Sequence, residues 1–325
     1  MSFRKYLPAV VIVSLLAAGL IYIEASNTSQ VKTETIEKVK VAYKQSVPSF
    51  PIFVGIEKGY FREQNLEIEP VVLESTNQMI EAVVRGDVEA SAVGAVEPAL
   101  AAEAVSPGNY KFYGQVQWSK NNFLDYLLVQ KNSPISKVQD LSGKKIGVAP
   151  GGASVIYTKL FLQHFFDPND VSIEQLDSKI LVQALAAGSV DAVVGNEPLG
   201  TIAIEKGIAR VLLERPYTDY VPYLPEITGV GLLSSKFIRE RPDIAKKFVA
   251  VMDDSFKYGN AHPGQVKEIL PSCCGVSEEI ALKIPHLGVY SGSSAIDKTV
   301  LQKFADFLSE QGLLEKKIDT ANLPF

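Results

Sequence analysis

Residues 79–98 read MIEAVVRGDVEASAVGAVEP, and residues 181–198 read LVQALAAGSVDAVVGNEP. Each stretch predicts a helix that ends at glycine, a short apolar strand, and a second helix that begins at a Glu-Pro pair. Gly86 and Gly188 suit the left-handed residue that follows a helix, and proline suits a first helical turn, where its missing N–H costs nothing. The apolar strands are typical of a buried parallel sheet. The same structural unit is therefore predicted twice.

The two halves of the chain also open alike. Residues 39–43 (VKVAY) and 144–148 (KKIGV) are predicted strands, each followed by a loop of small residues and then by a helix. Alternating strands and helices predict an α/β protein in which helices flank mostly parallel sheets. Two further apolar strands, residues 124–130 and 227–233, are interpreted as crossings between two lobes.

These crossings set the predicted domain bounds. Residues 36–127 and 228–325 are assigned to lobe 1, and residues 128–227 are assigned to lobe 2. Residues 243–258 and 300–308 carry a 3.6-residue apolar pattern, which predicts helices in the C-terminal part of lobe 1. Two lobes joined by two crossings leave a cleft between them.

The N-terminal 35 residues have a different character. Arg4 and Lys5 precede an apolar stretch, residues 7–23, and a polar segment follows. This order is typical of an export signal, and the apolar stretch is at the short edge of the length that spans a membrane. A signal cleaved near Ala25 and an uncleaved anchor both fit. Either places the rest of the chain outside the cytoplasm, in the periplasm or on the outer face of the cytoplasmic membrane.

Composition excludes several classes of function. The net charge is −5, and no long basic run is present, which argues against a nucleic-acid partner. Of the three histidines, neither His164 nor His262 has a nearby serine or cysteine in the sequence context of a nucleophile. No phosphate-binding, dinucleotide-binding or hydrolase motif occurs. The sequence therefore predicts no catalytic residue, no metal site and no cofactor.

The two cysteines are neighbours. Cys273 and Cys274 lack the spacing of a metal site. Two alternatives remain: a vicinal disulfide formed in an oxidising compartment, or two buried thiols in a loop after Pro271.

Candidate ligand contacts follow from the predicted sheets, because ligands of open parallel sheets lie beyond the carboxyl ends of the strands. In the first half, the loops at these ends contain Gln45, Thr76 and Gly94. Thr76 begins a predicted helix, whose free N–H groups attract anions. Capping and turn formation without any ligand would explain the same residues.

The second half offers the matching set, Gly152, Ser154 and Glu197. The glycine-rich turn before Ser154 opens another helix, and helix ends from both lobes could hold one anionic group. A carboxylate would instead hold an ammonium group or another hydrogen-bond donor. We expect Glu97 to cap its own helix and Glu197 to contact ligand.

Several motifs carry a resemblance to a known family. Residues 39–43, the stretch GIEKGYF at 55–61 and NLEIE at 65–69 resemble the opening of nitrate/sulfonate/taurine-type ABC transporter substrate-binding proteins. DLSGKKIGV at 140–148 resembles the start of their second lobe. This family shares its fold with pyrimidine-synthase-like proteins, and the resemblance covers about residues 37–318.

The resemblance implies a type II periplasmic-binding fold that closes on its ligand through a hinge. Carried over by position, it implies ligand contacts at Gln45, Phe50, Ser154, Glu197 and Thr228. The synthase relatives have a cysteine-rich motif that this chain lacks, which argues against an enzyme.

The expected protein is a monomeric, non-enzymatic receptor that binds a small anionic or zwitterionic solute, such as a sulfonate, nitrate or taurine, and delivers it to an ABC permease. A pyrimidine-related enzyme on the same fold and a membrane-anchored ligand sensor remain alternatives.

Overall fold

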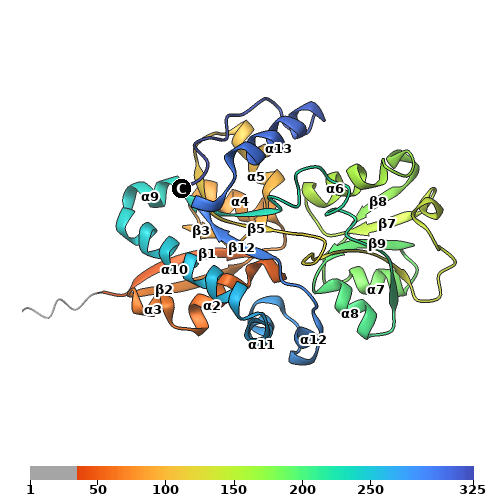
Figure 1. Ribbon diagram of the computed structural model, residues 1–325, viewed down its shortest axis with the longest axis horizontal. Coiled ribbons are helices and arrows are strands. Elements are labelled where there is room, and N and C mark those ends of the chain that lie inside the picture. Colours follow the sequence, from red (N-terminus) through yellow and green to blue (C-terminus); the bar gives the residue numbers. More distant parts are fainter. Residues whose placement is uncertain (1–34) are drawn as a thin grey trace, which may run out of the picture. The chain divides into compact units, whose positions relative to one another are not determined.

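The computed structural model describes residues 35–325, so the predicted export signal or anchor in residues 1–34 lies outside the described residues. Within the described range, none of the helices combines the length and hydrophobicity that crossing a bilayer requires. The expected α/β fold with two sheets is confirmed (Figure 1).

The first sheet has the strand order β12-β5-β11-β3-β1-β2, and β4 pairs with β11 beside this row. Its strands are β1 (Glu37–Tyr43), β2 (Leu66–Val72), β3 (Ala90–Ser91), β4 (Gly94–Ala95), β5 (Tyr110–Gln117), β11 (Gly229–Ser234) and β12 (Val289–Gly292). The second sheet has the order β10-β6-β9-β7-β8. Its strands are β6 (Asp125–Gln130), β7 (Lys145–Val148), β8 (Ser172–Gln175), β9 (Ala192–Asn196) and β10 (Ala209–Glu214).

The helices that accompany the first sheet come from both ends of the described chain. They are α2 (Phe50–Glu57), α3 (Tyr60–Glu63), α4 (Thr76–Arg85), α5 (Val96–Val105), α9 (Ser235–Glu240), α10 (Pro242–Ala261), α11 (Pro263–Cys274), α12 (Glu278–Lys283) and α13 (Lys298–Glu310). Those of the second sheet are α6 (Gly152–Leu162), α7 (Leu181–Ala186) and α8 (Leu199–Glu205). Short 3-10 turns span Val47–Ser49, Val138–Leu141, Pro168–Asp170 and Ser293–Ala295.

The repeated sequence unit forms the parallel centre of each sheet. β1 lies between β2 and β3, with Val41 opposite Ala90, and β7 lies between β8 and β9, with Ile146 opposite Ala192. Gly86 (φ 76°) and Gly188 (φ 71°) take the left-handed conformation after α4 and near the end of α7. Antiparallel strands flank both centres, so each sheet is mixed.

Alternating side chains divide the core of the second sheet. Tyr126 and Leu128 of β6 belong to one apolar cluster with residues of α7 and α8, while Leu127 and Val129 belong to the other. This period of two places α7 and α8 on one face of the sheet and α6 on the other (Figure 1).

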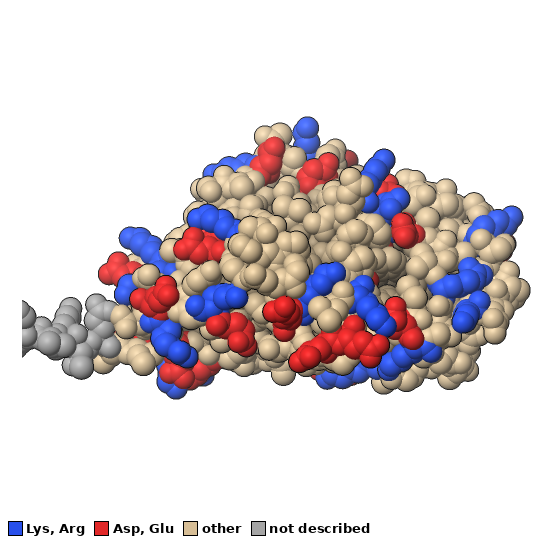
Figure 2. All heavy atoms as spheres, turned by 60° about the horizontal axis from the view of Figure 1, so that its bottom comes forward, with Lys and Arg blue, Asp and Glu red and all other residues tan. Residues whose placement is uncertain are grey.

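Charged side chains of both signs are interspersed over the molecular face in Figure 2.

The cysteines do not lie in a loop, so that part of the prediction is wrong. Pro271 stands inside α11, and Cys273 and Cys274 end that helix as free thiols. Proline removes one helical hydrogen bond. The buried apolar face of α11, which includes Ile269 and Leu270, stabilises the helix across that gap.

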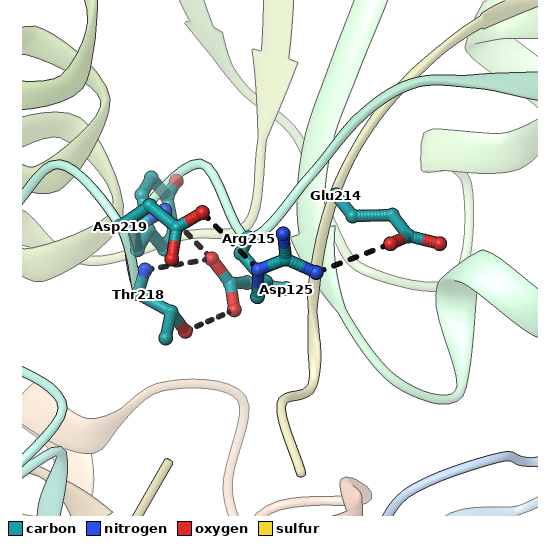
Figure 3. A network of polar contacts seen from close by, with 6 residues as sticks. Asp125, Glu214, Arg215, Thr218 and Asp219 are labelled. Carbon is teal, nitrogen blue, oxygen red and sulfur yellow. Dashed lines mark hydrogen bonds and ion pairs between the residues drawn. The ribbon is translucent and has the colours of Figure 1, made fainter. Parts of the chain in front are cut away.

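The chain passes between the sheets twice, through residues 118–124 and through residues 215–228. The predicted crossing strands, residues 124–130 and 227–233, fall instead on β6 and β11, which belong to the sheets that these passages enter. Asp125 is the first residue of β6, is fully buried, and connects the two passages through its side chain (Figure 3). Its carboxylate accepts hydrogen bonds from Tyr217 N (2.6 Å), Thr218 N (3.0 Å) and Thr218 Oγ1 (2.7 Å). Burial raises the pKa of Asp125, and these bonds oppose that rise by stabilising the charged form.

The Asp125→Ala substitution would leave the Thr218 hydroxyl and two backbone N–H groups without their acceptor. We expect it to lower the free energy of unfolding by about 2–4 kcal/mol, measured by urea denaturation. Asp219→Ala is the matched control, because Asp219 makes one ion pair with Arg215 at 3.1 Å and should cost less than about 1 kcal/mol. Equal losses in the two variants would contradict this role of Asp125.

Candidate functional site

A cavity of about 390 Å³ lies between the two sheets and is lined from both. Much of its lining comes from loops that follow the parallel strands, as the rule for open α/β sheets predicts. From the first sheet these residues include Lys44, Gln45, Ser46, Glu74, Thr76, Asn77, Gly94 and Ala95, and from the second Gly151, Ser154, Ser178, Lys179, Asn196 and Glu197.

The cavity wall brings together six of the eight residues proposed from sequence. Gln45, Thr76, Gly94, Ser154, Glu197 and Thr228 all line it. Their contact with a ligand stays a prediction. Sequence reasoning therefore located the cavity by the loops that form it.

Phe50 and Gly152, which were also proposed as ligand contacts, are not among the residues that line the cavity. Phe50 is 1% exposed, and its ring packs edge-on against Tyr290 with centroids 4.8 Å apart. Packing the whole ring into the core at the start of α2 removes more apolar surface from water than lining a cavity would. At Gly152 a Cβ atom would meet nothing within 4 Å, whereas its neighbours Gly151 and Ala153 reach the cavity.

Apolar side chains form much of the remaining wall. They are Val93, Val116, Leu181, Val182, Val194, Leu199 and Ile202. Such a wall suits the hydrocarbon part of a small ligand, with a few polar groups fixing its orientation.

Lys44 supplies the cavity with a positive charge that has no ion-pair partner within residues 35–325. It directly follows β1 and is partly buried, and burial lowers its pKa. No described residue forms an ion pair or a hydrogen bond with the Lys44 Nζ atom, whereas the cavity-lining Lys179 pairs with Glu74 at 3.1 Å. A desolvated ammonium group is unfavourable without a partner. An anion bound beside it would remove that cost.

The N-terminus of α6 adds a second positive element. Its first turn contributes Ala153 and Ser154 to the wall, and no side chain caps it at Gly151. The N-terminus of α4 differs, because the Ser75 side chain accepts a hydrogen bond from Gln78 N (3.2 Å). Of the two helix ends that the sequence indicated, the α6 end has uncapped N–H groups and the favourable end of a helix dipole.

Three buried polar atoms in cavity-lining residues have no hydrogen-bond partner within residues 35–325. They are Trp118 Nε1, Tyr157 Oη and Asn196 Oδ1. Buried polar groups in folded proteins are nearly always paired, so these atoms are expected to bond to ligand or water. Sequence reasoning missed Lys44 and Asn196, although each stands at the carboxyl end of a predicted strand.

Glu197 caps its helix and Glu97 does not, which is the reverse of the capping expected for these two glutamates. Glu197 accepts hydrogen bonds from Thr201 N (3.1 Å) and Thr201 Oγ1 (3.0 Å), so it caps the start of α8. Glu97 Oε2 is buried without a hydrogen-bond partner among the described residues, so the predicted cap is wrong. Burial raises the pKa of Glu97 to about 7 and also raises that of Glu197, where the bonds from Thr201 oppose the rise.

The raised pKa of Glu97 predicts a pH dependence of stability. Between its ordinary pKa of 4.5 and about 7, the folded state holds this proton more tightly than the unfolded state. The free energy of unfolding therefore falls as pH rises through that window, by as much as about 3 kcal/mol from this group.

Glu97→Gln keeps the shape of the side chain and removes the titration. Urea denaturation at about pH 5 and about pH 8 should show a smaller loss of stability on raising the pH in the variant than in the native chain. Identical losses in the two proteins would mean that Glu97 does not titrate in this window.

Within residues 35–325, no group of three His, Cys, Asp or Glu side chains is placed to hold a metal ion. None of His164, His262 and His286 lines the cavity. The site is thus an apolar cavity with an unbalanced ammonium group, an uncapped helix end and unpaired hydrogen-bonding groups.

Comparison with known proteins identifies relatives across the chain. The profile of the family described as NMT1/THI5 like matches residues 47–266, more than half of the chain. A protein of Bacillus subtilis (strain 168), provisionally described as an aliphatic sulfonates-binding protein, is 26% identical over 98% of this chain and 94% of its own length.

Two other relatives differ in function from each other. The alkanesulfonate-binding protein SsuA from Xanthomonas axonopodis pv. citri, solved with bound MOPS, superposes with a TM-score of 0.71 at 18% identity, covering 89% of this chain and 98% of that one. The Saccharomyces cerevisiae (strain ATCC 204508 / S288c) protein THI13, a 4-amino-5-hydroxymethyl-2-methylpyrimidine phosphate synthase, is 24% identical over 66% of this chain and 64% of its own length. The periplasmic-binding fold expected from the sequence is confirmed.

Proposed function

The chain belongs to the NMT1/THI5-like family, and from this premise we propose that it is the extracytoplasmic solute-binding protein of an ABC importer for a sulfonate. The relatives that bind aliphatic sulfonates or alkanesulfonates motivate the choice of ligand. The observation that carries it is the unbalanced ammonium group of Lys44 in an otherwise largely apolar cavity.

A sulfonate carries a negative charge, hydrogen-bond acceptors and a hydrocarbon part, which complement the groups that line this cavity. Its charge would balance Lys44, and its oxygens accept hydrogen bonds from Lys44, from Trp118 Nε1 and from the free N–H groups of α6. Its hydrocarbon part would pack on the apolar wall. Nitrate offers the charge but no apolar part, and taurine would place an ammonium group in the same cavity. An alkanesulfonate is therefore the first choice of ligand.

Closure of the lobes around the ligand is part of the proposal. Two ion pairs connect elements of the two sheets: Glu74–Lys179 at the cavity, and Glu205–Lys283 at 2.6 Å between α8 and α12. Ligand contacts that exist only when both sides meet would shift the population toward this closed arrangement, which the permease would recognise. Partial exposure of both pairs limits each to a small contribution.

An enzyme on the same fold is the second candidate, raised by the likeness to the yeast synthase. Cys274 is the cavity-lining thiol, and no histidine lies in the cavity wall to act as its base. A receptor returns its ligand unchanged, so mass spectrometry of a sulfonate or pyrimidine recovered after incubation separates the two candidates. A changed product would favour the enzyme. The membrane-anchored sensor would share the ligand site and differ in its partner.

Lys44→Met tests the site, because methionine keeps the apolar stem and removes the charge. We expect alkanesulfonate affinity, measured by isothermal titration calorimetry, to fall about 10- to 100-fold through loss of one charge-assisted hydrogen bond. Lys246→Met is the control, since Lys246 is exposed on α10 and does not line the cavity. If the folded native protein binds no sulfonate from a panel of chain lengths, the proposed ligand class is wrong.

The Glu74–Lys179 ion pair tests closure separately. Lys179→Ala and Glu74→Ala should each weaken sulfonate binding by less than about fivefold, because an exposed ion pair contributes at most about 1 kcal/mol. The double variant should bind no more weakly than either single variant, since both remove the same interaction. Additive losses would show that the two side chains act independently and that their ion pair does not stabilise the closed arrangement.

A further inference from the structure

Cys273 and Cys274 form a buried pair of thiols beside the ligand cavity. Their Sγ atoms are 2.7 Å apart, and the side chains are 0% and 5% exposed. That separation is longer than the roughly 2.05 Å of a disulfide bond, so the two thiols are neighbours that are not bonded to each other. Cys274 lines the cavity, so a small reagent that enters the cavity meets this thiol first.

The backbone around the thiols is in direct contact with the cavity wall. Gly275 ends α11 in the left-handed conformation, with φ of 63°. A Cβ atom at Gly275 would lie 3.1 Å from Gln45 Nε2, so this turn packs closely on Gln45. Gln45, Cys274 and Gly275 all line the cavity. A movement of the backbone at the thiols would therefore move the wall itself.

We propose that Cys273 and Cys274 are a thiol–disulfide modification site, which a small disulfide oxidant converts to an intramolecular disulfide that reshapes the ligand cavity. The thiolate of Cys274 attacks one sulfur of the oxidant and forms a mixed disulfide, releasing the other half of the oxidant as a thiolate. Cys273, after losing its proton, attacks the Cys274 sulfur and releases the second half. The two protons end on the two released thiols, and the oxidant gains the two electrons that the cysteines lose.

The order of attack follows from position. Cys273 is fully buried, and burial together with the hydrogen bond to Cys274 raises the pKa of its thiol. It is therefore a poor first nucleophile, because the thiolate is the reactive form. Once Cys274 carries the mixed disulfide, the second step is intramolecular.

The bridge changes the backbone because the two residues are adjacent. Neighbouring Cα atoms are about 3.8 Å apart across a trans peptide, whereas disulfide-linked residues usually have Cα atoms about 4.4–6.8 Å apart. Closing the bond therefore requires rearrangement of the last turn of α11 and of the Gly275 turn against Gln45. The reduced protein is expected to be the high-affinity form, and this part of the inference rests on the proposed function.

The experiment treats the reduced full-length chain with the small oxidant bis(2-hydroxyethyl) disulfide under non-denaturing conditions and measures its intact mass. The expected product has lost two hydrogen masses and carries no adduct. Cys273→Ser should stop at one hydroxyethylthio adduct on Cys274, and Cys274→Ser should stay unmodified. A native chain that stays unmodified while folded, or that keeps one or two adducts, overturns the modification site.

Affinity supplies the second measurement. An alkanesulfonate should bind the oxidised protein about tenfold more weakly than the reduced protein, with full recovery after dithiothreitol. The Cys273→Ser/Cys274→Ser double variant should show no response to oxidant. A bridge that forms without changing affinity overturns the coupling to the cavity. If neither form binds any sulfonate, the proposed function fails, and the mass result still decides the modification site.

Discussion

The hydrogen bonds of Asp125 are the interaction on which the arrangement of the two sheets depends. A fully buried carboxylate at the start of β6 accepts three hydrogen bonds from residues 217 and 218, so the outgoing and returning passages of the chain are fastened together (Figure 3). An ionised carboxylate is costly to bury without donors. Backbone N–H groups supply two of the three, and they are fixed in place by the course of the chain. The candidate cavity lies between the two sheets that these passages connect.

The same topology explains why positive charge is left unpaired in the cavity wall while the carboxylates there are engaged. Parallel strands from both sheets direct their carboxyl ends toward the cavity, so loops and helix starts form its polar wall. Glu74 and Lys179 neutralise each other, and Glu197 is occupied in capping α8. The Lys44 ammonium group remains without a counter-charge among the described residues, as does that of the more exposed Lys206, and Lys44 shares the cavity wall with the uncapped start of another helix. A cavity of this kind favours an anion with an apolar body.

The sequence predicted the repeated unit and the cavity loops because both depend on local rules. Glycine after a helix and an apolar strand follow from backbone geometry, and the unit around Gly86 and Gly188 was found at the centre of each sheet. The direction of a side chain depends on tertiary packing, which is why Phe50 turned out to be a core residue. Glu97 and Glu197 share a Glu-Pro pattern, and only their neighbours decide which one caps a helix. Lys44 was overlooked because its importance lies in the absence of a nearby carboxylate.

Unpaired groups in the cavity bear on the proposed coupling between binding and closure. Trp118 Nε1, Tyr157 Oη and Asn196 Oδ1 are buried without partners in this arrangement, and Lys44 lacks a counter-charge. In the proposed closure, each of these groups would need a partner, which ligand or trapped water would supply. The ion pairs across the lobes are too exposed to hold the lobes together alone. If ligand supplies the partners from both lobes at once, as proposed, occupancy and closure would form one equilibrium. A permease that recognises the closed form would then respond to loaded receptors and ignore empty ones.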